Sequence, residues 1–98
     1  MIVIAGSATA KPGAFDRPRA EGLAPSERSR RENGCLRHRL YVDAADRMRL
    51  FFYEGWRDRT AAEAHFRHPD TSAMLVLIRE HAAASEGPTL FEATPLRR

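Results

Sequence analysis

Apolar and polar residues alternate along two neighbouring stretches in the middle of the chain. In residues 35–42 one alternating set is apolar apart from a histidine, and it consists of Leu36, His38, Leu40 and Val42. In residues 48–56 both alternating sets carry large aromatic side chains. A repeat of two residues is typical of β-strands, and the short polar connection between the two stretches favours antiparallel pairing. The β-branched and small residues of 2–10, which end at a Lys-Pro-Gly turn, predict an earlier strand.

The second half of the chain carries helical patterns. Asp58 or Thr60 is expected to cap a helix over residues 61–68, which Pro69 would end because proline has no N–H for a helical hydrogen bond. A second helix with one apolar face is predicted over residues 70–84. The pair Gly87-Pro88 would break that helix, and residues 89–96 predict a final strand.

Residues 14–33 combine helix-forming residues with three breakers, which are Pro18, Gly22 and Pro25. Ser26 is suited to cap a short helix over residues 27–32, since a serine hydroxyl can accept a hydrogen bond from the first helical turn. Residues 14–24 could form either a separate helical turn or a loop. The region therefore predicts one helical connection between the first two strands.

The predicted order β-α-β-β-α-β is the plan of a ferredoxin-like α+β domain, an antiparallel sheet with helices on one face. We expect residues 1–98 to form a single domain of this kind. Helices can cover only one face, so the aromatic side chains on the other face of residues 48–56 would meet water. A second copy would cover them, at about 25 cal/mol for each Å² of apolar area buried. The pattern thus predicts a homodimer joined through the open sheet face.

Charge and cysteine content disfavour several classes of function. The 16 Lys and Arg residues against 13 Asp and Glu residues give a net charge of only +3, which is weak support for nucleic-acid binding. No apolar run reaches the roughly 20 residues that a membrane helix needs. The apolar start has no basic segment of the kind that opens a signal peptide, which favours the cytoplasm. Cys35 is the only cysteine, so neither an intrachain disulfide nor a cysteine metal cluster can form.

Glu54, Trp56 and His65 are the main candidates for chemistry. Glu54 and Trp56 are two residues apart on one predicted strand and therefore share a face with Leu50 and Phe52. His65 falls in the following helix, and a short connection keeps the start of that helix close to the end of the strand. Partial burial would raise the pKa of the Glu54 carboxyl and suit it to proton transfer. The indole of Trp56 would offer a flat apolar wall and an N–H donor.

A purely structural role explains the same residues equally simply. Glu54 and His65 could hydrogen-bond each other and the backbone without any chemistry. His38 alternates with leucines and could point inward from the neighbouring strand, either as a half-buried structural histidine or as a pocket residue beside Phe52 and Leu50. The chain has no glycine-rich phosphate loop, no nucleophile elbow and no zinc-protease motif.

Several short motifs occur in a characteristic order between residues 32 and 69. They are Gly34-Cys35-Leu36, Asp43, Glu54-Gly55-Trp56, Asp58 and Ala64-His65. In this order and spacing the chain resembles the antibiotic biosynthesis monooxygenase family, which includes quinol monooxygenases. The resemblance covers most of the chain apart from residues 14–31.

The resemblance implies a dimeric ferredoxin-like α+β barrel that oxygenates a quinol or polyphenol with O2 and needs no flavin, haem or metal. Trp56 would then be the wall and donor, with Glu54 and His65 handling protons. Two positions depart from the family pattern: Pro69-Asp70-Thr71 stands where many relatives have a histidine and an aromatic residue, and His38 stands where relatives often have an aromatic ring. Either departure would change the substrate or remove activity.

Three other functions are compatible with the sequence, because a fold does not determine a reaction. The first is a non-catalytic module that binds an aromatic ligand in the same pocket. The second is an isomerase of a small metabolite. The third is a dimerisation module with a solid core, which would leave no cavity against Glu54 and Trp56.

Overall fold

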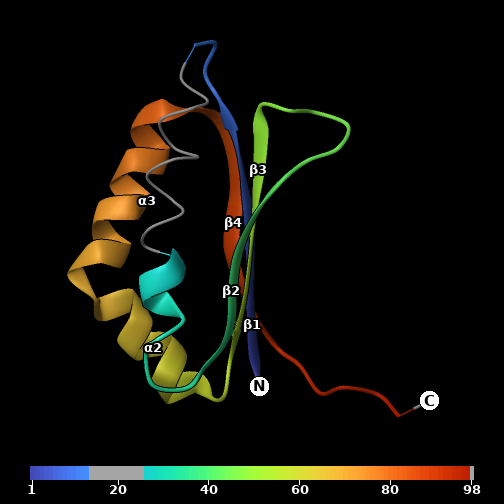
Figure 1. Cartoon of the computed structure of the whole chain (residues 1–98), viewed down its shortest axis with the longest axis vertical. Helices are drawn as coiled ribbons and strands as arrows, with labels where there is room; N and C mark the ends of the chain where they lie inside the picture. The colour runs from blue at the N-terminus through green and yellow to red at the C-terminus, as the bar shows by residue number, and fades with distance from the viewer. Residues whose placement is uncertain (14–25, 98) are drawn as a thin grey trace.

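The computed structural model describes residues 1–13 and 26–97 (Figure 1). Its strands and longer helices are β1 (Ile2–Ala10), β2 (Cys35–Val42), β3 (Arg49–Trp56), α2 (Arg59–Arg67), α3 (Pro69–His81) and β4 (Ala82–Glu92). Residues 26–29 are also helical. The alternatives for residues 14–24 lie outside the described residues.

The four strands form one sheet in the order β2-β3-β1-β4, and every neighbouring pair is antiparallel. Helices α2 and α3 lie on the same side of this sheet, and the other side carries no helix among the described residues (Figure 1). This arrangement confirms the predicted ferredoxin-like α+β class.

Strand β3 divides its side chains between the helices and the open face. The face toward the helices carries Leu50, Glu54 and Trp56, which are 2%, 8% and 0% exposed. Phe51, which points the other way, is 39% exposed. Because successive strand residues point to opposite faces, this register places the Glu-x-Trp motif inside the molecule.

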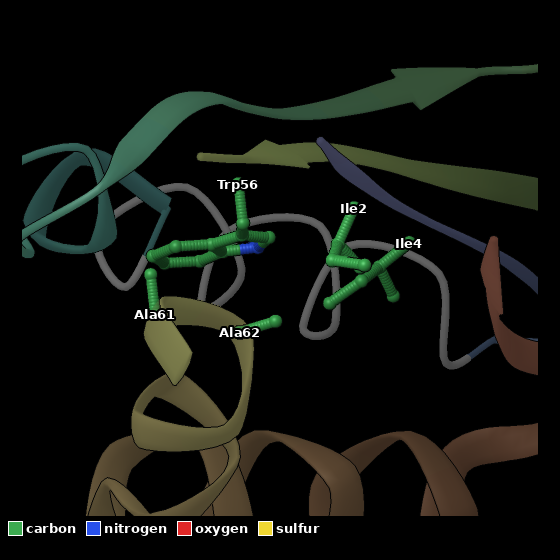
Figure 2. Close-up of a cluster of buried hydrophobic side chains, with 5 residues drawn as sticks. All are labelled: Ile2, Ile4, Trp56, Ala61 and Ala62. Carbon is green, nitrogen blue, oxygen red and sulfur yellow. The ribbon is translucent and has the colours of Figure 1, made fainter. Parts of the chain in front are cut away.

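The packed centre of the domain is a small cluster around Trp56. Figure 2 shows its indole ring above the start of α2, with Ala61 and Ala62 beneath it and Ile2 and Ile4 beside it. The two alanines have short side chains, so α2 can approach the ring closely. The cluster fixes the start of α2 against the end of β3.

The helix boundaries differ from the predicted ones for local reasons. Helix α2 begins at Arg59 and is capped by Asp58, whose side chain accepts a hydrogen bond from the Ala61 N–H; Thr60 lies inside the helix. A short helix is present here as predicted, but it includes Ser26 and turns begin at residue 30, so the bounds of 27–32 and the cap at Ser26 were wrong.

The end of the second predicted helix was also wrong. Helix α3 stops at His81, and β4 begins at once with Ala82. The pair Gly87-Pro88 lies inside β4, where a register shift opposite Ala5 and Ser7 accommodates it. Gly87 has φ of +78°, and a Cβ there would lie 2.7 Å from the Ala5 carbonyl oxygen. The breaker residues therefore mark a bulge in a strand that hydrogen-bonding to β1 holds together.

Gly34 directly precedes β2, packs against the start of α2 and provides a stability test. Its carbonyl accepts a hydrogen bond from the Arg57 N–H at 2.7 Å, its φ is +83°, and a Cβ there would lie 2.6 Å from the Ala61 Cβ. Gly34→Ala should therefore lower the free energy of unfolding by the left-handed backbone cost of about 1–2 kcal/mol plus about 1–3 kcal/mol for overpacking. Gly13→Ala is the matched control, because Gly13 has φ of +79° and no neighbour within 4 Å of the added Cβ. Urea unfolding measures both, and equal losses would show that the contact with α2 is not tight.

Candidate functional site

Three titratable side chains from three different elements meet between the sheet and the helices. His38 of β2 stands directly opposite Glu54 of β3 in the strand register, and His65 reaches them from α2. The Nε2 atoms of His38 and His65 lie 3.4 Å and 3.3 Å from the same atom, Oε1 of Glu54. Glu54 and His65 are buried. We call His38, Glu54 and His65 the His-Glu-His triad.

The hydrogen bonds of Ser26 determine which ring nitrogen of His38 carries the proton. The Ser26 Oγ lies 3.0 Å from the His38 carbonyl oxygen and 2.8 Å from the His38 Nδ1. A carbonyl can only accept, so the hydroxyl proton goes to it, and both contacts are satisfied when Nδ1–H donates to Oγ. A neutral His38 then presents an unprotonated Nε2 to Glu54.

Hydrogen bonds to residues outside the triad also determine which ring nitrogen of His65 faces Glu54. Its Nδ1 lies 2.9 Å from Glu32 Oε2 and 3.4 Å from the Thr71 hydroxyl. A carboxylate only accepts, so Nδ1–H donates to Glu32 and the Nε2 of a neutral His65 is again left with its lone pair toward Glu54. Two imidazole nitrogens and one carboxylate oxygen thus converge. Such a group of acceptors is stable only when a proton or a cation lies among them.

Trp56 supplies the remaining contact of the Glu54 carboxylate. Its Nε1–H donates to Glu54 Oε1 at 3.0 Å, and its ring centroid lies 4.6 Å from that of His65. Both contacts are inside the protein, because Trp56 has no exposed surface. The tryptophan therefore fixes the position of the carboxylate and supports the imidazole of His65.

Burial dominates the acid–base properties of the triad. It raises the pKa of the Glu54 carboxyl, although the charge of His65 and the hydrogen bond from Trp56 act in the opposite direction. Burial also lowers the pKa of His38 to about 4, and the charge of His65 acts in the same direction. At neutral pH His38 is consequently a neutral base, while Glu54 holds its proton more readily than an exposed glutamate.

The triad forms the polar end of a cavity of about 370 Å³ between the sheet and α3. The other walls are mostly apolar, and they include Leu40, Phe52, Phe66, Met74, Leu75 and Ile78. Cavities of this size and character accommodate small organic molecules. The arrangement can bind an apolar ring and place a polar group of that ring next to a buried base.

The predicted site residues divide into two groups. Glu54, His65, His38 and Phe52 all line the cavity. Trp56 and Leu50 are not among the lining residues, since both are almost fully buried in the packed interior. The aromatic wall of the cavity is formed by Phe52 and Phe66, and Trp56 acts on the site through its N–H. The catalytic roles assigned to Glu54, Trp56 and His65 stay predictions.

Several residues of the site were not anticipated from sequence. Ser26 and Glu32 hold the two histidines, and Arg28 lines the cavity while its Nε lies 2.9 Å from Asp70 Oδ2. The i,i+4 spacing of Arg28 and Glu32 was visible, but only the three-dimensional path brings this segment against α2.

The antiparallel sheet, the helices on one of its faces and the buried polar cluster between them define a ferredoxin-like α+β domain with an internal cavity. The sequence model of the antibiotic biosynthesis monooxygenase family matches residues 1–76, and the chain belongs to this family. Within the described parts of the chain, the helices are all too short or too polar to span a bilayer.

Several known proteins are similar to this chain in structure or in sequence. A proposed antibiotic biosynthesis monooxygenase from Deinococcus radiodurans superposes with a TM-score of 0.91 at 18% identity, covering 100% of this chain and 97% of that one. An antibiotic biosynthesis monooxygenase gives a TM-score of 0.82 at 28% identity, covering 97% and 100%. An uncharacterized protein of Synechocystis sp. strain PCC 6803 is 35% identical over 68 residues, or 69% of this chain. The chain spans only 46% of the length of that relative.

The low pKa of His38 predicts a pH-dependent stability. Its pKa is about 4 in the fold against 6.5 for a free histidine, so between these values the unfolded chain binds more protons. The free energy of unfolding should therefore fall as the pH drops from about 6.5 to about 4, by a contribution on the order of 1–3 kcal/mol from this residue.

Comparison of the wild type with His38→Asn isolates this contribution. The raised pKa of Glu54 stabilises the fold as the pH falls, which opposes the effect of His38, but it is present in both proteins. Urea unfolding at pH 7 and pH 5 should show a smaller loss in His38→Asn than in the wild type. His81→Asn, which changes a histidine outside the triad, should retain the wild-type loss. An equal pH response in all three proteins would mean that His38 is not held neutral in the fold.

Proposed function

We propose that this protein is a monooxygenase that uses O2 to oxidise a small aromatic molecule of the quinol or polyphenol type, with no bound cofactor. Membership of the antibiotic biosynthesis monooxygenase family supports the reaction class. The observation that carries the proposal is the buried His-Glu-His triad, whose three side chains converge at the edge of a largely apolar cavity of about 370 Å³. An aromatic ring fits such a cavity, and a proton acceptor stands at its polar end.

The substrate can supply all the electrons of this reaction. An activated CH2 group between aromatic rings plus O2 gives a carbonyl group plus water, so no external reductant is needed. In the first step a triad nitrogen or the Glu54 carboxylate removes a C–H proton, and the carbanion forms a C–O bond with O2. After protonation, the O–O bond of the resulting peroxide breaks as the second C–H proton leaves, and water is released.

Each residue has a distinct part in this scheme. Glu54 and His65 exchange the proton, because the His65 Nε2 and the Glu54 Oε1 lie only 3.3 Å apart. Phe52 and Phe66 contact the ring from two sides of the cavity. Trp56 holds Glu54 in place through its N–H and is a positioning residue rather than a wall. The low dielectric of the buried site strengthens these interactions.

Oxygen consumption tests the proposal directly. Purified protein is mixed with a panel of anthrones and hydroquinones on an oxygen electrode, and spontaneous autoxidation is subtracted. We expect uptake above background, and Glu54→Gln should lower the rate by about 10²- to 10⁴-fold, as loss of a general acid–base group does. Trp56→Phe should lower it less, because the ring is kept and only the N–H donor is lost.

The controls separate chemistry from folding. His81→Asn should keep the wild-type rate, and circular dichroism should be the same for all variants. Trp56→Ala is unsuited to this test, since removing a fully buried aromatic ring costs about 3–5 kcal/mol of stability. Uptake that is unchanged in Glu54→Gln would remove the triad from the mechanism.

A second candidate is a non-catalytic binder of an aromatic ligand. The hydrogen bonds of the Nδ1 atoms favour this function. Ser26 holds the Nδ1 of His38 and Glu32 holds the Nδ1 of His65. These contacts can fix the two histidines in place without any chemistry. Saturable ligand binding by calorimetry with no oxygen consumed, across the whole panel, would support this function over the oxygenase.

We also propose that two copies pair through the open face of the sheet. Tyr41, Phe51 and Phe91 are 50%, 39% and 51% exposed. Tyr41 and Phe51 are direct partners in the register, and Phe91 belongs to the same face through its partner Val3. Apolar surface gathered on one face of a sheet is typical of a protein interface.

Charge introduced on this face should disrupt the pairing. Phe51→Arg is expected to convert a dimer into a monomer in sedimentation-velocity runs, because a second copy would have to bury the new charge. Val76→Arg changes a residue of α3 that is 47% exposed, and it should leave the dimer intact. A wild-type protein that sediments as a monomer at micromolar concentration would contradict the proposal.

A further inference from the structure

We infer that the His-Glu-His triad is a binding site for one divalent first-row transition-metal ion, of the kind represented by Zn²⁺ and Fe²⁺. The ligand atoms are the Nε2 of His38, a carboxylate oxygen of Glu54 and the Nε2 of His65, and all three lie within 4.8 Å of one another. This inference goes beyond the proposed oxygenase function and does not rest on it.

The spacing of the atoms fits metal coordination. Zinc lies about 2.0–2.2 Å from imidazole nitrogen and carboxylate oxygen, which puts two ligands of one tetrahedral ion roughly 3.3 Å apart. The two nitrogen-to-oxygen distances in the triad are 3.4 Å for His38 and 3.3 Å for His65. Two of the three ligand pairs therefore already have the separation that one ion requires, and the two histidine nitrogens lie within 4.8 Å of each other.

The hydrogen bonds around the triad prepare each ligand. The Ser26 hydroxyl and the Glu32 carboxylate accept the Nδ1–H protons of His38 and His65, so both lone pairs on Nε2 are directed inward. The Trp56 N–H holds the Glu54 carboxylate. Metal-binding histidines in proteins are typically oriented by such carboxylate or hydroxyl partners, which also raise their basicity.

The donor set indicates the class of metal. Two imidazoles and one carboxylate suit Zn²⁺, Fe²⁺ and similar ions, whereas Mg²⁺ and Ca²⁺ require mostly oxygen ligands. Three protein ligands on one side leave coordination positions open toward the cavity, as in catalytic rather than structural sites. A small molecule in the cavity could thus contact the ion.

Metal binding and the proposed proton transfer compete for the same lone pairs. If both proposals hold, the metal-free protein consumes oxygen and the zinc-loaded protein does not. The two proposals are tested independently of each other. Calorimetry measures metal binding without turnover, and the oxygen electrode measures turnover in chelator-treated protein.

The test uses the full chain without a histidine tag, stripped of metal by a chelator. Calorimetric titration with ZnCl2 should show one ion for each chain, and Co²⁺ should give visible absorption bands from a low-symmetry site. MgCl2 should give no binding. Loss of a residue that hydrogen-bonds a metal ligand typically lowers metal affinity by about 10- to 100-fold, so Ser26→Ala should lower the zinc affinity within that range. Glu54→Gln and His38→Asn each remove a ligand and should lower the zinc affinity by more than about 100-fold.

His81→Asn is the matched control, since it removes a histidine outside the triad and should bind zinc like the wild type. Circular dichroism verifies that each variant is folded. Because Glu54→Gln and His38→Asn lie on different strands, one of them can still test the site if the other misfolds. Absence of zinc binding at micromolar concentration would overturn the inference. Equal affinity of the wild type, Glu54→Gln and His38→Asn would overturn it as well, because the ion would then bind elsewhere.

Discussion

The burial of one carboxylate, that of Glu54, determines how the rest of the site is built. A carboxylate that leaves water must find partners in the protein, because an unpaired buried charge is very costly. Here the Trp56 N–H on the same strand donates to it, and the Nε2 atoms of two histidines on neighbouring elements lie 3.4 Å and 3.3 Å from the same oxygen, so a proton or a cation must lie among these acceptors. Packing of Trp56 in the core therefore also fixes the group that the chemistry needs.

Small residues of β1 and β4 leave room for the cavity beneath α3. Gly6 and Ala82 are among the lining residues at the β1 and β4 side, and neither extends far into the space below the helix. Larger residues such as Met74 and Ile78 approach from α3. A small apolar volume bordered by a polar triad results, and each of the proposed functions depends on what occupies the lone pairs of that triad.

The local patterns predicted the strands and the Glu-x-Trp face because a period of two residues translates directly into sheet geometry. His38 could be placed beside Glu54 only as a possibility, since the alternation shows its face but not its partner. The end of α3 was missed because Ala82 and Ala84 pair with β1 instead of extending the helix, and the pairing resumes at Thr89 beyond Gly87-Pro88. Ser26 and Glu32 could not be anticipated, since their contacts join residues 12 and 33 positions apart in sequence.

Helix α3, which covers the cavity, is joined to its neighbours without a flexible loop at either end. His68 ends α2 and also caps α3 through its side chain, and α3 passes directly into β4 at Ala82. A cover joined in this way cannot swing open as a rigid lid on flexible hinges. Side-chain volume at positions such as Met74 then limits the size of a ligand in the cavity. A new ligand specificity would arise by substitution at these positions rather than by remodelling of a loop.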